Sequence, residues 1–366
     1  MRFLPLVGVL AACSFLPAQT AAFSTYGAGC YSQRASFFEV FPTNAFDLSG
    51  TTANPRGYSM INIGQGWLVL PLLSGWRTPS AAAQVVTLLD DSVSPPLAFG
   101  FTMPYPGGTT DSVWASSNGF CYLASDSSNG CCSGDAAQML AGAPRIAGLW
   151  MDLNPAAGGQ ITLDRDTQNG GVAYLTYSGV PEFGASGSLT FQVAFYSFGQ
   201  IDVLYGPCMN AGHTALSGWS PGRGVASPGA MNLSALLQNV IITGPDQDPL
   251  VLSSTGRPRL GTSMPVAITN VPNTSPFVWI AVGSTQYPNG VDLGAIGMSG
   301  CVQYASFENA FGAPTVGATA TWQLGVPNAT GLIGQRAYLQ ALAMAPDLNS
   351  LGLIVSNAAN LLVGTL

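Results

Sequence analysis

Short runs of alternating apolar and polar residues are the feature that most constrains the fold of this chain. Within residues 188–196, the large apolar side chains occupy every second position: Leu189, Phe191, Val193 and Phe195. A period of two is typical of a strand with one buried face. A Phe198-Gly199-Gln200 turn separates this run from residues 201–205, so the two segments are predicted to form a hairpin.

The same pattern recurs elsewhere. A second hairpin is predicted from residues 160–163 and 172–177, which flank a polar loop with the turn dipeptide Asn169-Gly170. Helical periodicity is nearly absent, since residues 135–140 and 233–238 would each form only a turn or two. With 45 glycines and 26 prolines in 366 residues, a helical bundle is excluded and the predicted class is all-β.

Composition predicts how the chain divides. A stretch rich in serine and alanine at 78–83 ends a first block, and Gly256-Arg257-Pro258-Arg259 opens a last block with its own strand rhythm. We expect two β-sandwich-like domains after a signal peptide and a short N-terminal β-rich segment. The predicted ranges are 1–22 for the signal peptide, 23–85 for the N-terminal segment packing on the middle domain, 86–255 for the middle domain and 256–366 for the C-terminal β-sandwich.

The N-terminus is typical of an exported protein. Arg2 is followed by an apolar stretch up to Pro17 and then by small residues, which predicts cleavage near Ala22. The sequence Leu10-Ala11-Ala12-Cys13 also resembles a lipobox, and lipidation of Cys13 would anchor the protein to a membrane as a lipoprotein. No later stretch has the ~20 apolar residues of a transmembrane helix.

The number of cysteines is also typical of an exported protein. Apart from Cys13 there are six, an even number, and in an exported chain these are disulfide candidates: Cys30, Cys121, Cys131, Cys132, Cys208 and Cys301. The connectivity stays open, but the four cysteines from 121 to 208 are expected to cluster in one domain. Adjacent cysteines rarely bond to each other, so Cys131 and Cys132 are expected to have other partners. No C-x-x-C is present and His213 is the single histidine, which argues against a zinc site.

The distribution of charge excludes nucleic-acid binding. All ten basic residues are arginines, mostly isolated in the sequence, against 17 acidic residues and a net charge of −7. Binding to phosphates requires clustered basic side chains. A surface with so few charges has little repulsion between copies, which favours self-association or incorporation into an outer layer.

One motif resembles an enzyme signature. Residues 218–222 (GWSPG) match the G-x-S-x-G nucleophile elbow of hydrolases. Pro221 lacks the backbone N–H that would complete the oxyanion hole, and His213 precedes Ser220 instead of following it. We therefore expect no catalytic residue and no enzyme. The aspartates that occur in pairs or in turn contexts are expected to cap backbone groups: Asp90, Asp91, Asp152, Asp164, Asp166, Asp246 and Asp248.

Two ligand sites are weighed against purely structural roles. Asp164, Asp166 and Asn169 have the spacing of the start of a calcium loop, although Leu175 occupies the position of its final acid. No other cofactor is expected. Among seven tryptophans, Trp76 and Trp219 stand beside Gly, Arg or Pro and are predicted to be exposed, where either ring would stack on a sugar. The other strand tryptophans, including Trp114, are assigned to the core.

Four segments of the middle block carry a family resemblance: VWASSNGFCYL at 113–123, PRIAGLWMDLNP at 144–155, residues 189–206, and ALSGWSPG at 215–222. In order and spacing they resemble a nidogen-like (NIDO) extracellular domain. The last block resembles a C-terminal β-sandwich of secreted proteins from planctomycete-type bacteria, on Pro272, residues 291–294, Gly300-Cys301 and residues 355–357. These resemblances imply a surface, matrix or adhesion role and carry no catalytic set.

The sequence thus predicts a secreted or cell-surface, non-enzymatic protein. Its expected partner is an extracellular protein, a polysaccharide or another copy of the chain. A carbohydrate-binding β-sandwich is the main alternative, and a secreted hydrolase is the third.

Overall fold

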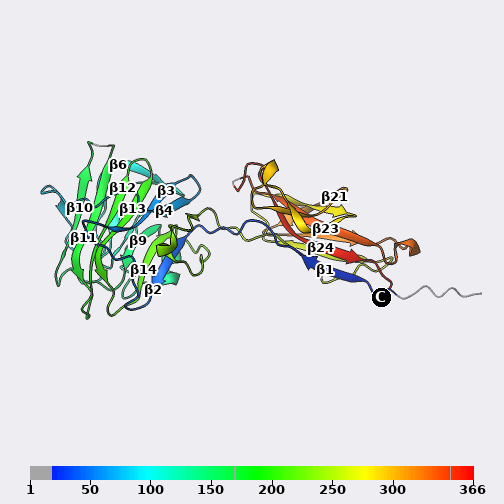
Figure 1. Cartoon of the computed structure of the whole chain (residues 1–366), viewed down its shortest axis with the longest axis horizontal. Helices are drawn as coiled ribbons and strands as arrows, with labels where there is room; N and C mark the ends of the chain where they lie inside the picture. Colours follow the sequence, from blue (N-terminus) through cyan, green and yellow to red (C-terminus); the bar gives the residue numbers. More distant parts are fainter. Residues whose placement is uncertain (1–18, 169, 347) are drawn as a thin grey trace, which may run out of the picture. The chain divides into compact units, whose positions relative to one another are not determined.

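The computed structural model describes residues 19–168, 170–346 and 348–366 (Figure 1). The all-β class is confirmed, because the only α-helix of these residues is the single-turn α1 (Ala136–Leu140). Three short 3₁₀ segments accompany it: η1 (Leu233–Ala235), η2 (Gly294–Ile296) and η3 (Thr330–Leu332). The chain forms two compact units. The first unit is Gln33–Asp246, and the second unit combines residues 19–32 with Gln247–Leu366.

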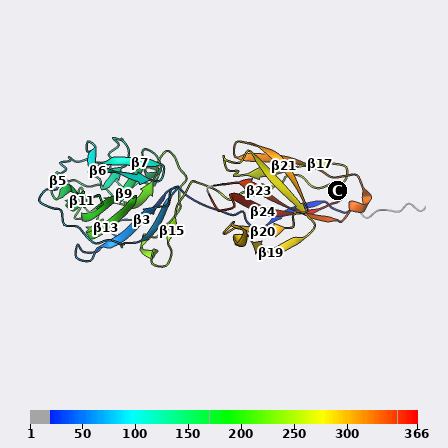
Figure 2. The same ribbon diagram turned by 90° about the horizontal axis from the view of Figure 1, so that it is seen from above.

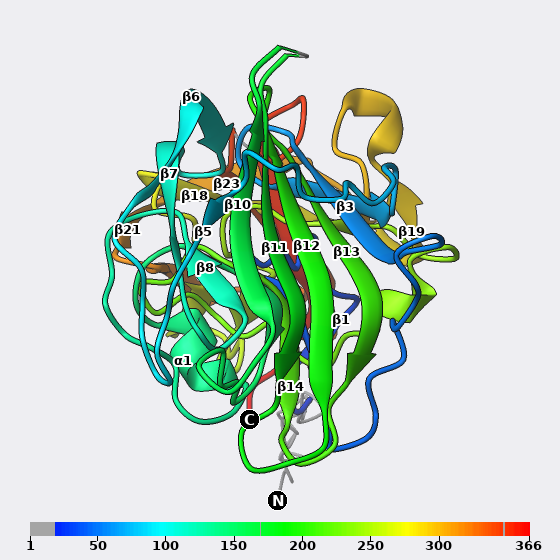
Figure 3. The same cartoon turned by 90° about the vertical axis from the view of Figure 1, so that its left-hand side faces the viewer.

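The first unit contains two antiparallel sheets. The larger has the order β15 (Ile241–Ile242), β4 (Trp67–Pro71), β3 (Arg56–Asn62), β13 (Gln200–Met209), β12 (Ser188–Tyr196), β11 (Val172–Pro181), β10 (Gln160–Asp166) and β5 (Gln84–Val85). The smaller has the order β2 (Phe37–Phe41), β14 (Ala215–Ser220), β9 (Arg145–Trp150), β8 (Phe120–Tyr122), β7 (Gly108–Ala115) and β6 (Leu97–Tyr105). Figure 3 shows β10 to β13 side by side.

Both predicted hairpins are confirmed. Strand β12 pairs with β13 through Phe195 and Ile201, and β10 pairs with β11 through Asp166 and Val172. The four alternating apolar residues of β12 are all buried. Local sequence alone decides these hairpins, because each turn directly joins the two strands that it pairs.

The two sheets of the first unit pack face to face around one core. Gly148 of β9 lies against the ring of Phe191 in β12, and a side chain on Gly148 would collide with that ring. The hydroxyl of Tyr205 donates to the carbonyl of Gly148 (2.6 Å), and Ser217 on β14 hydrogen-bonds to both Tyr205 and Tyr58. Neutral buried hydroxyls therefore connect the two layers.

The second unit is built on an eight-stranded antiparallel sheet. Its order is β1 (Ala22–Tyr26), β24 (Leu353–Leu362), β23 (Arg336–Met344), β18 (Phe277–Gly283), β21 (Asn309–Val316), β22 (Thr319–Gly325), β17 (Ser263–Thr269) and β16 (Val251–Ser253). The side chain of Asn357 on β24 bonds both the N–H and the C=O of Leu252 on β16. The sheet therefore folds over on itself and encloses a second apolar core.

A short hairpin of β19 (Gln286–Asp292) and β20 (Val302–Ala305) completes the second unit (Figure 2). The buried amide of Gln340 on β23 connects it to the large sheet. This amide accepts from the N–H of Tyr304 (2.8 Å) and donates to the carbonyl of Val302 (2.9 Å).

The N-terminal segment does not follow the predicted division. Strand β1 pairs with β24 along its whole length, from Ala22 opposite Leu362 to Tyr26 opposite Ala358. The predicted segment 23–85 is therefore divided between the units after Ser32, and the second unit begins again at Gln247 rather than at 256. Composition did not indicate this because β1 completes a sheet whose other strands lie far along the chain.

Most of the predicted signal peptide, with Cys13, lies outside the described residues. Its last residues belong to the second unit, where the N–H of Ala21 donates to the carbonyl of Leu366 (2.8 Å) and the N–H of Thr365 to that of Gln19 (2.8 Å). Cleavage near Ala22 would remove these two bonds and keep most of β1. None of the described helices has the length and apolarity to cross a bilayer.

The cysteines pair differently from the prediction. Disulfides join Cys30 to Cys301 and Cys131 to Cys132, whereas Cys121 and Cys208 are buried free thiols. The four cysteines from 121 to 208 do lie in one unit, as expected, but only two of them are bonded, and the adjacent pair bonds to itself, against expectation. Cys121 lies on β8 and Cys208 on β13, in different sheets. Burial raises the pKa of the Cys208 thiol to about 12.

The Cys30–Cys301 bond connects the N-terminal segment to the rest of the second unit. Replacing both cysteines by alanine is expected to lower that unit's free energy of unfolding by about 2–5 kcal/mol, because the cross-link restricts the unfolded chain. Calorimetry would measure this loss. Each single Cys→Ala variant should cost about as much as the double variant, and small additive effects of the single variants would contradict the cross-link.

Candidate functional site

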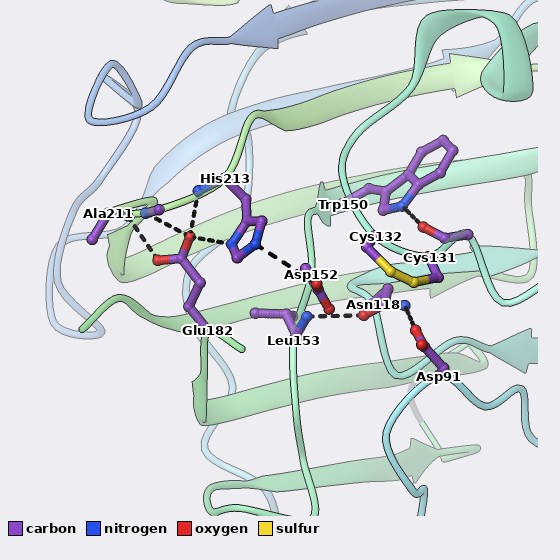
Figure 4. A network of polar contacts seen from close by, with 12 residues as sticks. Asp91, Asn118, Cys131, Cys132, Trp150, Asp152, Leu153, Glu182, Ala211 and His213 are labelled. Atoms are coloured by element: carbon purple, nitrogen blue, oxygen red, sulfur yellow. Dashed lines mark hydrogen bonds and ion pairs between the residues drawn. A yellow bond between two sulfur atoms is a disulfide. The ribbon is translucent and has the colours of Figure 1, made fainter. Parts of the chain in front are cut away.

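Polar side chains from six chain segments converge at one place in the first unit (Figure 4). Each segment follows, precedes or connects strands, so the sheets determine where these loops meet. The residues are Asp90 and Asp91 before β6, Asn118 between β7 and β8, the 129–132 loop before α1, Asp152 after β9, Glu182 after β11, and His213 between β13 and β14. We call these residues the loop cluster.

Asn118 connects the segments of the loop cluster. Its side chain is fully buried, and its Oδ1 accepts from the N–H of Leu153 (2.8 Å). Its Nδ2 donates to Oδ1 of Asp91 (2.9 Å) and to the carbonyl of Asn129 (3.2 Å). Gly119 completes the Asn-Gly turn with a φ of +80°, in the left-handed region that favours glycine. One amide therefore joins three loops to the end of β9.

The 129–132 loop is positioned by two further contacts. Nε1 of Trp150 donates to the carbonyl of Gly130 (2.8 Å), and Nδ2 of Asn129 donates to the carbonyl of Asp91 (3.0 Å). The Cys131–Cys132 disulfide therefore lies beside Asp91 (Figure 4).

Glu182 lies in a pocket of hydrogen-bond donors. Its carboxylate is fully buried and accepts from the N–H groups of Ala211 (2.8 Å), Gly212 (2.8 Å) and His213 (2.7 Å). It also lies 2.9 Å from Nδ1 of His213. Nε2 of the same ring points to Oδ2 of Asp152, 3.7 Å away.

Asp152 has no such donors. It is 5% exposed, and no hydrogen bond to its carboxylate exists among the described residues. Its oxygens lie within 4.8 Å of carboxylate oxygens of Asp90 and Asp91. Burial raises the pKa of Asp152; His213 opposes this effect, and the like charges of Asp91, Asp90 and Glu182 add to it. Burial and Asp91 likewise raise the pKa of Asp90.

The predicted calcium residues have partners within the protein. Asp164 accepts from the N–H and the hydroxyl of Ser80 (both 2.8 Å), and Asp166 forms an ion pair with Arg77 (3.2 Å). Asn169 lies outside the described residues. Asp164 thus caps the backbone and hydroxyl of Ser80, while Asp166 pairs with an arginine. Calcium at this loop stays a prediction.

The predicted stacking tryptophans are placed differently. Trp219 is fully buried against Trp67 and Tyr105, so its predicted exposure is wrong. The alternation of β14 turns this ring into the core, which its neighbours Gly218 and Pro221 did not indicate. Trp76 is half-buried against an apolar cluster around Leu204.

Trp114, assigned to the core from sequence, is only half-buried. It lines an open depression of about 450 Å³ together with Pro95, Asp126 and the exposed Ser125 and Ser127. Sequence reasoning missed this site because the serines come from a separate loop after β8.

Ser220 of the G-x-S-x-G match lies at the end of β14 and is fully buried. Its hydroxyl accepts from the N–H of Gly222 (3.0 Å), which is a turn contact. His213 is engaged with Glu182 and Asp152 instead.

A family model described as NIDO related matches residues 75–243. The match spans β5 to β15 and the whole loop cluster, and it confirms the nidogen-like resemblance of the middle block. The resemblance stated for the C-terminal block stays a prediction. No curated protein and no solved structure matches the chain.

The hydrogen bonds of Asn118 lead to a stability prediction. Asn118→Ala is expected to lower the free energy of unfolding of the first unit by about 3 kcal/mol, because buried N–H and C=O groups lose their partners. Chemical denaturation measures the change. The matched control Asn239→Ala, at an exposed site in the same unit, should stay within about 0.5 kcal/mol of the wild type. A cost for Asn118→Ala as small as that of the control would contradict the role of this side chain.

Proposed function

We propose that this chain is an exported, non-enzymatic protein of the cell surface or extracellular matrix, with a structural or adhesive role. The match of residues 75–243 to the NIDO-related family carries the proposal, because nidogen-like domains are extracellular modules without a catalytic set. The Cys30–Cys301 disulfide supports it, since structural disulfides persist in oxidising compartments.

The loop cluster supports a non-enzymatic role. Glu182, His213 and Asp152 lie in the order of a catalytic relay, but among the described residues no hydroxyl or thiol hydrogen-bonds to the His213 ring. A nucleophile in contact with its base is the first requirement of such a relay. Ser220, the serine of the G-x-S-x-G match, is buried.

The proposed partner is an extracellular protein, a polysaccharide or another copy of the chain. With 7% charged residues, contacts through this surface would depend on apolar groups, hydroxyls and amides rather than on ion pairs.

A carbohydrate ligand is the second candidate function, and the depression at Trp114 favours it. A half-exposed indole beside two serine hydroxyls and the Asp126 carboxylate offers an apolar face and polar groups to a sugar ring.

Export is tested on the full chain expressed with its own N-terminus in a bacterial host. Fractionation followed by intact-mass analysis should place the protein outside the cytoplasm, starting near Phe23, with two thiols that react with iodoacetamide only after unfolding. A mass that begins at a lipidated Cys13 would make it a membrane-anchored lipoprotein. A cytoplasmic chain with all cysteines reduced would contradict the proposal.

The carbohydrate candidate is tested by screening a panel of polysaccharides. If one binds at the depression, Trp114→Ala should weaken its binding at least about tenfold, because the stacking face is lost. The matched control is Trp76→Ala, which removes a half-buried indole outside the depression and should bind like the wild type. Equal binding by all three proteins would exclude the Trp114 site.

A further inference from the structure

We propose that Asp90, Asp91 and Asp152 form a binding site for a divalent cation of the calcium type. The site differs from the Asp164–Asp166 loop that the spacing of acidic residues suggested, and it depends on the three-dimensional convergence of two loops.

The first observation is an uncompensated cluster of negative charge. The three carboxylates come from the segment before β6 and from the end of β9, and their oxygens lie within 4.8 Å of one another. Among the described residues, none of the three pairs with an arginine, and His213 is the one basic side chain in contact, 3.7 Å from Asp152. Like charges at this separation repel unless protons or a cation offset them.

The second observation is independent of the charge count. Asp152 is 5% exposed and accepts no hydrogen bond from the described residues, and its one basic neighbour, Nε2 of His213, lies 3.7 Å away, beyond hydrogen-bond distance. Oδ1 of Asp90 is buried without a donor. Buried carboxylates in proteins are paired, hydrogen-bonded or coordinated to metals. The nearby carboxylate of Glu182 is hydrogen-bonded in this way, by three backbone N–H donors and a histidine. Asp152 has no such donors, and coordination to a cation would satisfy its carboxylate.

The cluster is positioned before any cation binds. Asn118 donates to Asp91, and the N–H of Phe183 donates to the carbonyl of Asp152 (3.0 Å). On the other side, Glu182 orients the His213 ring toward Asp152. In metal sites, ligating carboxylates are commonly held by hydrogen bonds from residues behind them, as Asn118 holds Asp91.

The donor atoms indicate which cation fits. Cys131 and Cys132 lie beside Asp91, but their sulfurs are joined in a disulfide and supply no thiolate. The remaining donors are carboxylate oxygens on loops. Hard cations bind such groups, and calcium tolerates irregular coordination better than magnesium does. Calcium sites of extracellular modules have dissociation constants of about 10⁻⁴ to 10⁻³ M, and we expect the same range here.

The test compares melting temperatures of the full-length protein in EDTA and in millimolar calcium chloride. Calcium should raise the melting temperature of the wild type, because it binds the folded state. Asp152→Asn, which keeps the shape and removes the charge, should melt above the wild type in EDTA and below it in calcium. Its dissociation constant for calcium should rise at least about tenfold. The same measurement with magnesium tests the preference for calcium.

Two controls separate this site from others. Asp111→Asn changes an exposed aspartate of β7 and should respond to calcium like the wild type. Asp164→Asn tests the loop first suggested by sequence and should also keep the response. If Asp152→Asn does not fold, Asp90→Asn takes its place. The proposal is overturned if calcium leaves the wild-type melting temperature unchanged, or if Asp164→Asn abolishes the shift and Asp152→Asn does not.

Discussion

Three loops of the first unit are joined by the hydrogen bonds of one buried side chain, Asn118. Its amide bonds the backbone after β9, the carboxylate of Asp91 and the carbonyl of Asn129. Without these bonds, the segment before β6 and the 129–132 loop would lose their common anchor. The Asn-Gly turn at 118–119 therefore does more than reverse the chain, because its side chain positions the loops around Asp152.

Buried polarity in this protein is mostly neutral. Ser217 with two tyrosines connects the sheets of the first unit. In the second unit, the amide of Gln340 connects the short hairpin to the large sheet, and that of Asn357 joins two distant strands of the large sheet. Arg145 is an exception, since it is 2% exposed and lies over the rings of Phe120, Tyr122 and Trp150 at 4.7–5.1 Å. Only 7% of the residues in the chain are charged, so the grouping of three carboxylates, Asp90, Asp91 and Asp152, in the loop cluster is unusual for this protein.

Interactions between neighbours in sequence were predictable, and those between distant segments were not. The alternation of β12 and the turn after it identify a hairpin, because strand, turn and partner are contiguous. The pairing of β1 with β24 and the Cys30–Cys301 bond join residues from opposite ends of the chain. The loop cluster also depends on segments that are distant in sequence. Its three aspartates, Asp90, Asp91 and Asp152, each resemble turn residues in sequence, and only the packing of the sheets brings them together. The flanking residues of Trp219 suggested exposure, but the position of the ring on β14 determines its burial.

The most direct measurement is a crystal structure of the protein grown in calcium chloride. The proposed site predicts one ion in the loop cluster, at about 2.3–2.6 Å from carboxylate oxygens of Asp90, Asp91 and Asp152. A loop cluster that contains only water at hydrogen-bond distances, with Asp152 bonded to a protonated neighbour, would contradict it. Calcium bound at Asp164 and Asp166 instead would return the site to the loop that the sequence first suggested.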